Sequence, residues 1–186
     1  MELLYSSLLG CLFGILAAWL FWKYLLFLKP KVEISPFIVA ENGSVIGENV
    51  YKFKILNNGN RQVINVVLNA WLCELMDVPG GKITTTLAQF NIRKSDTLTL
   101  SPAKNNERPW GLTPEATFRF IPHIDLEKEL LPPNRRIMIA LKVSDAVSGT
   151  TVVQQKTYFK KDIIYGEFKF GASLAAQDFD ASTWTP

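Results

Sequence analysis

Histidine and cysteine, which supply many metal sites and catalytic nucleophiles, are almost absent from this chain. His123 is the only histidine among 186 residues, so neither a histidine-rich metal cluster nor a histidine-containing catalytic triad can be assembled from it. Cys11 lies in an apolar N-terminal run and Cys73 in a strand-like run, so we expect no disulfide between them. The sequence also has no glycine-rich phosphate loop. We therefore expect no enzyme, no cofactor and no metal site.

Two charged groups remain open to more than one interpretation. Carboxylates recur within Asp125–Glu129 close to His123, which fits a metal or acid–base site, although closely spaced carboxylates are more often a solvated face. Arg135 and Arg136 follow two prolines. The pair is suited to binding an anion or, more simply, to the solvated entrance of a strand.

A strong excess of one charge is also missing. The formal net charge is only +3, and much of the basic charge lies close behind the N-terminal run. A chain without a basic patch gives no electrostatic footprint for nucleic acid. We expect no nucleic-acid partner.

An apolar run from Leu3 to Trp22 is the strongest signal in the sequence. It has no charged residue between Glu2 and Lys23, and about 20 helical residues span a bilayer core of roughly 30 Å. The alternative is a cleaved secretory signal, with cleavage after Ala17-Ala18. A signal peptide begins with positive charge, whereas only Met1-Glu2 precedes this run. The run therefore predicts a transmembrane helix over residues 1–28.

The charges around the run predict its orientation. All nearby positive charges follow the helix, so by the positive-inside rule the N-terminus lies outside and the C-terminal domain on the cytoplasmic, positive side. Aromatic and basic residues at this end are suited to the membrane interface and to contact with lipid. The predicted interface residues are Trp19, Trp22, Lys23, Tyr24, Lys29 and Lys31.

One face of the predicted helix is small. Ser6, Gly10, Gly14 and Ala18 recur every four residues and therefore follow nearly one stripe, where another helix can approach closely. Glycine and alanine are also common in membrane helices generally. We expect the stripe to be a helix–helix contact, either with other transmembrane subunits or with a second copy of this chain.

Short β-like segments separated by turn signals fill the rest of the chain. In Asn49–Leu56, aromatic and aliphatic residues alternate with Lys52 and Lys54, which predicts a half-buried strand with both lysines on its polar side. Only Asp125–Leu131 predicts a helical turn. The other predicted strands are Val32–Ala40, Val63–Met76, Ile83–Ile92, Thr97–Leu100, Ala116–His123, Arg136–Val143, Thr150–Phe159 and Phe168–Phe170.

These signals predict an all-β fold, an immunoglobulin-like β-sandwich, preceded by one N-terminal transmembrane α-helix. The expected parts are the helix over 1–28, a basic juxtamembrane junction over 29–31, the sandwich over 32–171 and a polar tail over 172–186. In the tail, Phe179 and Trp184 are able to dock on the sandwich.

The order of several motifs resembles a known family. The segments are Lys29-Pro30-Lys31, Ile34–Ala40, Phe53–Gly59, Val63–Leu72, Phe120–Asp125, Ile139–Thr151, Thr157–Phe159 and Asp162–Gly166. Their order and approximate spacing resemble the cytoplasmic C-terminal domain of inward-rectifier potassium channels. The resemblance implies an immunoglobulin-like fold, tetrameric assembly of that domain, and contact of Lys29 and Lys31 with anionic lipid.

The chain also departs from that family. It has one predicted membrane helix where the family has two, and it lacks the pore helix and the Thr-Val-Gly-Tyr-Gly filter. Potassium selectivity needs rings of backbone carbonyls from such a filter, so it is not implied here.

Two hypotheses about function follow. In the first, the sandwich is an interaction or scaffolding module of an accessory subunit, and the helix docks on the helices of a larger membrane complex. In the second, the chain oligomerises with itself as a ligand- or lipid-responsive signalling or effector protein that perturbs the membrane. The helix lacks polar pore-lining residues beyond Ser6, Ser7 and Cys11, which favours the first hypothesis.

Overall fold

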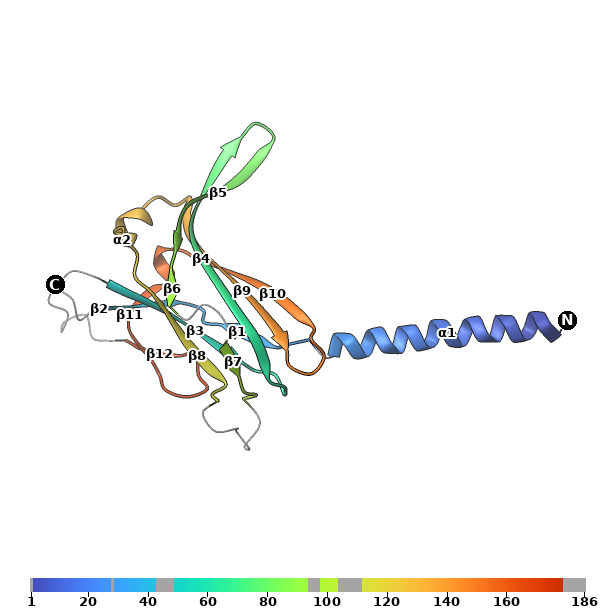
Figure 1. Ribbon diagram of the computed structural model, residues 1–186. Helices are drawn as coiled ribbons and strands as arrows, with labels where there is room; N and C mark the ends of the chain where they lie inside the picture. The colour runs from blue at the N-terminus through green and yellow to red at the C-terminus, as the bar shows by residue number, and fades with distance from the viewer. Residues whose placement is uncertain (1, 28, 43–48, 94–97, 104–111, 179–186) are drawn as a thin grey trace.

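A single long helix stands apart from a β-domain in the computed structural model (Figure 1), which describes residues 2–27, 29–42, 49–93, 98–103 and 112–178. The helix α1 covers Glu2–Phe27, and most of the described residues after it lie in strands of two sheets. The prediction of an all-β fold preceded by one N-terminal helix is therefore confirmed.

The surface of α1 is apolar on every side. Its large side chains are exposed all around the helix, as Phe13, Leu16 and Phe21 show at 63%, 50% and 61%. A helix that is apolar all round needs an apolar environment, either a protein core or a membrane. Within the described residues nothing buries the segment Tyr5–Tyr24, which is long and apolar enough to cross a membrane.

The first sheet is built around β3. Its order is β12-β11-β2-β3-β8-β6, and β1 also pairs with β3. All neighbours are antiparallel except β11 and β2, which are parallel. The strands are β1 (Val32–Ile34), β2 (Ile38–Asn42), β3 (Asn49–Asn57), β6 (Ile92–Arg93), β8 (Glu115–Phe120), β11 (Ile163–Phe168) and β12 (Ala176–Asp178).

The second sheet is built around one long strand. Its order is β10-β9-β4-β5, with the short β7 also paired to β4, and all pairs are antiparallel. The strands are β4 (Val63–Val78), β5 (Gly81–Phe90), β7 (Leu98–Leu100), β9 (Arg135–Asp145) and β10 (Thr151–Tyr158). The short helix α2 (Leu126–Glu129) precedes β9, and the 3-10 turn η1 (Lys160–Asp162) joins β10 to β11.

Both sheets contribute alternate residues to one shared core. β9 buries Ile137, Ile139 and Leu141, each 0% exposed, against the first sheet. On the first sheet, the rings of Phe53 and Phe118 stack at 5.7 Å between centroids. The period-2 burial is what a sheet with one buried face requires.

The predicted strand over Val32–Ala40 is divided into β1 and β2. Both pair with β3, but Ile34 and Val39 are five positions apart, whereas their partners on β3, Ile55 and Lys52, are only three positions apart. The extra residues around Pro36 bulge out of the ladder, since proline has no amide to donate. Ser35 stabilises this break, because its side-chain oxygen accepts from the amide of Lys54 at 3.2 Å.

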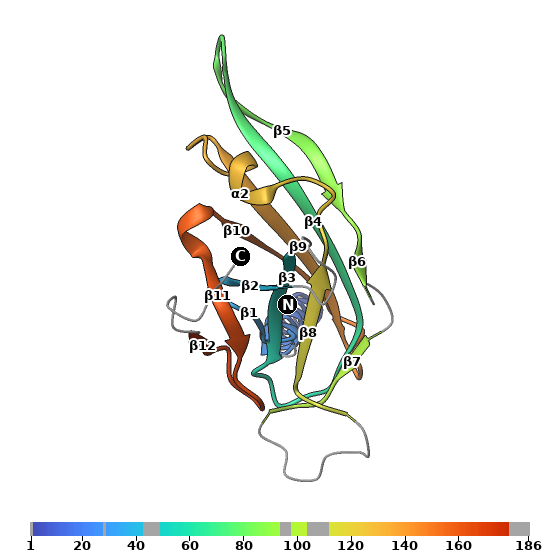
Figure 2. The ribbon, with the colours of Figure 1, turned by 90° about the vertical axis from the view of Figure 1, so that its left-hand side faces the viewer.

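The predicted strand over Ile83–Ile92 is also divided, because the chain passes from one sheet to the other after Phe90. β5 remains paired with β4, while β6 pairs with β8 in the first sheet. The β4–β5 hairpin projects well beyond the rest of the domain (Figure 2). Residues Met76 and Ile83 form a cross-strand pair on it and are 45% and 49% exposed.

The C-terminal part of the domain differs from the prediction. The strand expected at Phe168–Phe170 begins earlier, as β11 at Ile163, and Phe170 is fully exposed. The expected polar tail contributes β12, which pairs with β11 and extends the domain beyond residue 171. Phe179 and Trp184 lie outside the described residues.

Lys54 is the clearest exception to the alternation predicted for Asn49–Leu56. Its side chain does face away from the core, but it is only 3% exposed, because the chain around residues 169–171 covers it. The ammonium donates to the carbonyl oxygens of Lys169 at 2.9 Å and Gly171 at 2.7 Å. Burial lowers the pKa of Lys54, and the charge of Glu115 partly opposes this shift. Lys54 therefore fastens the end of β11 to β3.

We predict that Lys54→Met loosens this end of the domain without unfolding the rest. Methionine retains the apolar stem but loses two charge-assisted hydrogen bonds, each contributing about 1.5–3 kcal/mol before desolvation is subtracted. Amide exchange in β12 and at Lys169 should accelerate roughly tenfold for each 1.4 kcal/mol lost. Lys52→Met is the control, since Lys52 pairs with Glu41 instead. Equal exchange rates in the two variants would contradict the role of Lys54.

Candidate functional site

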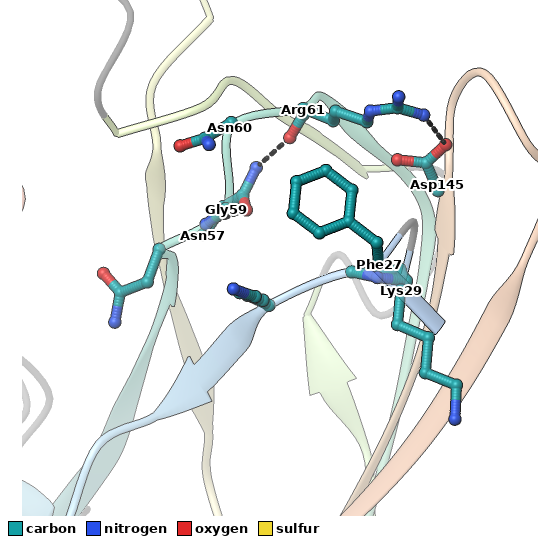
Figure 3. Close-up of a pocket in the computed structure, with 10 residues that line it drawn as sticks. Phe27, Lys29, Asn57, Gly59, Asn60, Arg61 and Asp145 are labelled. Atoms are coloured by element: carbon teal, nitrogen blue, oxygen red, sulfur yellow. Dashed lines mark hydrogen bonds and ion pairs between the residues drawn. The ribbon is translucent and has the colours of Figure 1, made fainter. Parts of the chain in front are cut away.

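The junction between α1 and the β-domain encloses a cavity of about 100 Å³. Figure 3 shows its walls, which come from the end of α1, the β3–β4 turn and the end of β9. The lining residues are Phe27, Lys29, Pro30, Lys31, Asn57, Asn58, Gly59, Asn60, Arg61 and Asp145. The junction residues 29–31, predicted as a basic stop, are thus part of a folded site.

Asn57 organises this site. Its side chain is fully buried, and its amide donates to the carbonyl oxygens of Arg61 at 2.8 Å and Ser101 at 3.0 Å. Its side-chain oxygen accepts from the amide of Gly59 at 3.0 Å. A Cβ at Gly59 would lie 3.0 Å from that oxygen, so glycine permits the close approach. One side chain therefore ties the β3–β4 turn to the end of β7.

The junction itself is fastened to this turn. The amide of Asn58 donates to the carbonyl oxygen of Lys31 at 2.8 Å, and Pro30 and Val32 are buried. Lys29 and Lys31 extend outward and are exposed. Since only a few residues separate α1 from β1, the domain is held close to the end of the helix.

The acidic side of the cavity is Asp145, whose side chain is only 2% exposed. Arg61 lies 3.7 Å away, a distance at which the two groups attract each other without a hydrogen bond. The carboxylate accepts from the amides of Val147 at 3.0 Å and Ser148 at 2.7 Å. Burial alone would raise the pKa of Asp145, but these hydrogen bonds and the Arg61 charge together lower it. Asp145 is therefore a charged structural anchor.

The small residues predicted to form a helix contact lie on the open surface of α1. Ser6, Gly10, Gly14 and Ala18 are all exposed, and a Cβ added at Gly10 or Gly14 would meet nothing within 4 Å. The stripe thus leaves room for another backbone to approach. A contact made by it stays a prediction.

The predicted interface residues gather at the other end of the helix. The ammonium of Lys23 lies 5.6 Å from the ring centre of Trp19 and 5.9 Å from that of Trp22, within cation–π range. Tyr24 is exposed one residue further on. The structure therefore brings three of the six residues into one cluster, while Lys29 and Lys31 belong to the junction.

The carboxylates near His123 do not converge on one point. Asp125 caps α2 by accepting from the amide of Lys128 at 3.3 Å, Glu127 accepts from the hydroxyl of Tyr165, and Glu129 pairs with Arg135. Across the described residues, no group of three or more histidine, cysteine or acidic side chains is arranged to hold a metal ion. Each carboxylate of this cluster has its own structural partner.

The two arginines also have partners of their own. Arg135 bridges Glu129 and Glu74, and Arg136 donates to the hydroxyl of Thr84 at 2.7 Å. Their side chains therefore lie across the base of the β4–β5 hairpin, and this arrangement favours the strand-entrance interpretation over an anion site.

The residues that build the junction site were missed by sequence reasoning. The run Asn57–Asn60 has the asparagine and glycine content of a turn, but nothing in it distinguishes a buried asparagine from a solvated one. Arg61 and Asp145 lie far apart in sequence, and only the pairing of β4 with β9 brings them together. Asn57 and Asp145 share one signal, which is a polar residue at the last position of an apolar strand.

No family model matches the sequence, and no curated protein matches it. Among solved structures, the crystal structure of Spo0M, a sporulation control protein from Bacillus subtilis, is similar at 12% sequence identity and a TM-score of 0.38. The similarity covers 70% of this chain and 48% of Spo0M. The chain thus spans about half the length of that protein.

We predict that Asp145→Asn removes one component of the pH dependence of stability. A carboxyl group whose pKa is lowered on folding stabilises the protein at pH values above its ordinary pKa, which is 3.8 for Asp145. This contribution is lost as the pH falls through the lower pKa of the folded state. The stability difference between wild type and variant, measured by chemical unfolding in detergent, should therefore shrink on acidification.

Asp77→Asn is the matched control, because Asp77 is exposed and lies 3.6 Å from Lys82. Its stability difference should stay near zero at every pH. A difference for Asp145→Asn that does not change with pH would contradict the assignment of Asp145 as a charged anchor.

Proposed function

We propose that this chain is a non-enzymatic, single-pass membrane protein whose β-domain acts as an interaction or scaffolding module, as an accessory subunit of a larger membrane complex. One observation carries the proposal: α1 is apolar on all sides and exposed, yet it is joined to a folded, docked junction rather than to a loose linker. In this arrangement α1 crosses the membrane and the β-domain lies against the cytoplasmic surface.

The exposed faces of the chain support an interaction role. Small residues leave one face of α1 open to another helix. In the β-domain, β5 lies at the edge of its sheet and has neither charge nor proline from Ile83 to Phe90. Natural proteins usually protect such an edge with charge, proline or cover. We infer that both faces are contact surfaces in the assembled complex.

The second candidate is a self-oligomerising signalling or effector protein. The same unprotected edge of β5 favours it, because an edge strand can pair with its own copy. This second candidate includes the proposal that the two sheets form an immunoglobulin-like sandwich related to the cytoplasmic domains of inward-rectifier channels. Support for that relation comes from the order of the sequence motifs and from two sheets facing one core.

Native mass measurement after gentle detergent extraction distinguishes the two candidates. For an accessory subunit, we expect the chain to leave the membrane together with other subunits, at a mass that is not a multiple of 21.0 kDa. A pure homo-oligomer, such as a tetramer, would contradict the accessory-subunit proposal and favour the second candidate.

We further predict that Gly14→Leu weakens assembly while leaving the β-domain folded. A leucine at this position fills the space that close helix approach requires, and helix packing in membranes depends on such approach. The measurement is the fraction of chain in the complex, with circular dichroism as the check on folding. Leu12→Phe adds bulk on the opposite side of α1 and should leave assembly unchanged. Equal assembly of both variants and wild type would remove the role of the stripe.

A further inference from the structure

The turn that joins β9 to β10 lies beside the end of α1. Asp145, the last residue of β9, lines the junction cavity together with Phe27 and Lys29, and Figure 1 shows the β9–β10 connection next to the C-terminal end of the helix. The turn is also tied to the β3–β4 turn, because the amide of Ala146 donates to the carbonyl oxygen of Gln62 at 3.0 Å. If α1 crosses a membrane, residues 145–150 lie where the domain meets its surface.

The tip of this turn presents an apolar side chain to the outside. Val147 is 79% exposed, more than any other large apolar residue of the described β-domain except Phe170. The turn that holds it is well ordered by hydrogen bonds. The Asp145 carboxylate accepts from the amides of Val147 and Ser148 and from the Ser148 hydroxyl. Val147 is therefore held outward by a rigid frame.

The backbone of the turn needs no water to satisfy its donors. From Asp145 to Thr150 every amide N–H has an acceptor in the protein. The acceptors are, in order along the turn, the carbonyl oxygens of Thr150 and Gln62, the Asp145 carboxylate twice, the carbonyl oxygen of Asp145 and the Ser148 hydroxyl. Unsatisfied amides are the main cost of moving an irregular segment into a water-poor phase. Because every amide N–H of this turn is already paired within the protein, its donors do not add to that cost.

The charges around the turn complement an anionic bilayer surface. Lys29 and Lys31 are exposed on the same junction, and each basic residue near an anionic surface contributes about 1 kcal/mol. The one carboxylate lining the cavity, that of Asp145, is buried and faces Arg61. Repulsion of Asp145 by lipid phosphates is therefore largely screened.

We propose that the β9–β10 turn is a second membrane contact, in which Val147 enters the lipid interface beside α1. The proposal rests on the proposed function in that α1 spans the membrane. Two contacts fix the tilt of the β-domain against the membrane plane, which a single helix would leave free. The turn thereby determines how far each edge of the domain lies from the membrane surface.

The test uses the full chain in vesicles of phosphatidylcholine and phosphatidylserine. A nitrobenzoxadiazole probe is attached to Val147→Cys in a Cys11→Ala background, where Cys73 is 0% exposed and protected from labelling. We expect blue-shifted emission and quenching by lipids that carry a doxyl group near the headgroup. The control is Leu131→Cys, an exposed apolar position at the other end of β9. Quenching at position 147 should be several-fold stronger than at position 131.

A third sample separates failure of this proposal from failure of the proposed function. In the wild-type chain the probe is attached to Cys11, which is exposed on α1. Lipid quenching at position 11 with water-like emission at both 147 and 131 overturns the second contact and leaves the membrane span in place. Water-like emission at position 11 overturns the span, and the second contact with it. Equal quenching at 147 and 131 also overturns the proposal, since the contact is then not specific to the turn.

Discussion

The hydrogen bonds of the buried Asn57 side chain are the interaction on which the junction depends. An asparagine without exposure must satisfy its donors and its acceptor inside the protein, because a buried polar group left unpaired costs about 1–3 kcal/mol. Asn57 meets this constraint by binding the carbonyl oxygens of Arg61 and Ser101 and the amide of Gly59. These hydrogen bonds fix the shape of the β3–β4 turn, and the turn holds the residues that follow α1. Without these hydrogen bonds, the helix would be attached by a flexible linker.

Lys54 and Asp145 follow the same rule at other places in the domain. Each is a charged residue removed from solvent, and each is surrounded by backbone groups of opposite polarity rather than by a single counterion. Lys54 binds carbonyl oxygens, and Asp145 binds amides. These backbone partners lie in turns. Lys54 therefore stabilises the chain after β11, and Asp145 stabilises the β9–β10 turn.

Sequence patterns predicted what depends on local order and failed where distant segments meet. The apolar run, the alternation in Asn49–Leu56 and most strand positions were visible because period and composition are local properties. The burial of Lys54 was not, since it depends on a turn that follows β11, and the strand positions near Phe168 were misplaced for the same reason. In the candidate site, Lys29 and Lys31 were identified from their charge. Asn57, Arg61 and Asp145 were not, because a buried polar residue has the same letter as a solvated one.

The parallel pairing of β2 with β11 has a consequence for how the chain is made. Ile38 pairs with Ile163, and the nearby hydrogen bond from Tyr158 to the carbonyl oxygen of Ser35 joins residues 123 positions apart. During synthesis, β1 and β2 leave the ribosome soon after α1, yet β2 cannot pair with β11 until a further 125 residues, from Ile38 to Ile163, have emerged. Contacts of such sequence separation form slowly. In the newly made chain the β2 edge of the first sheet therefore stays unpaired until β11 arrives, and this interval is when the chain is most exposed to aggregation.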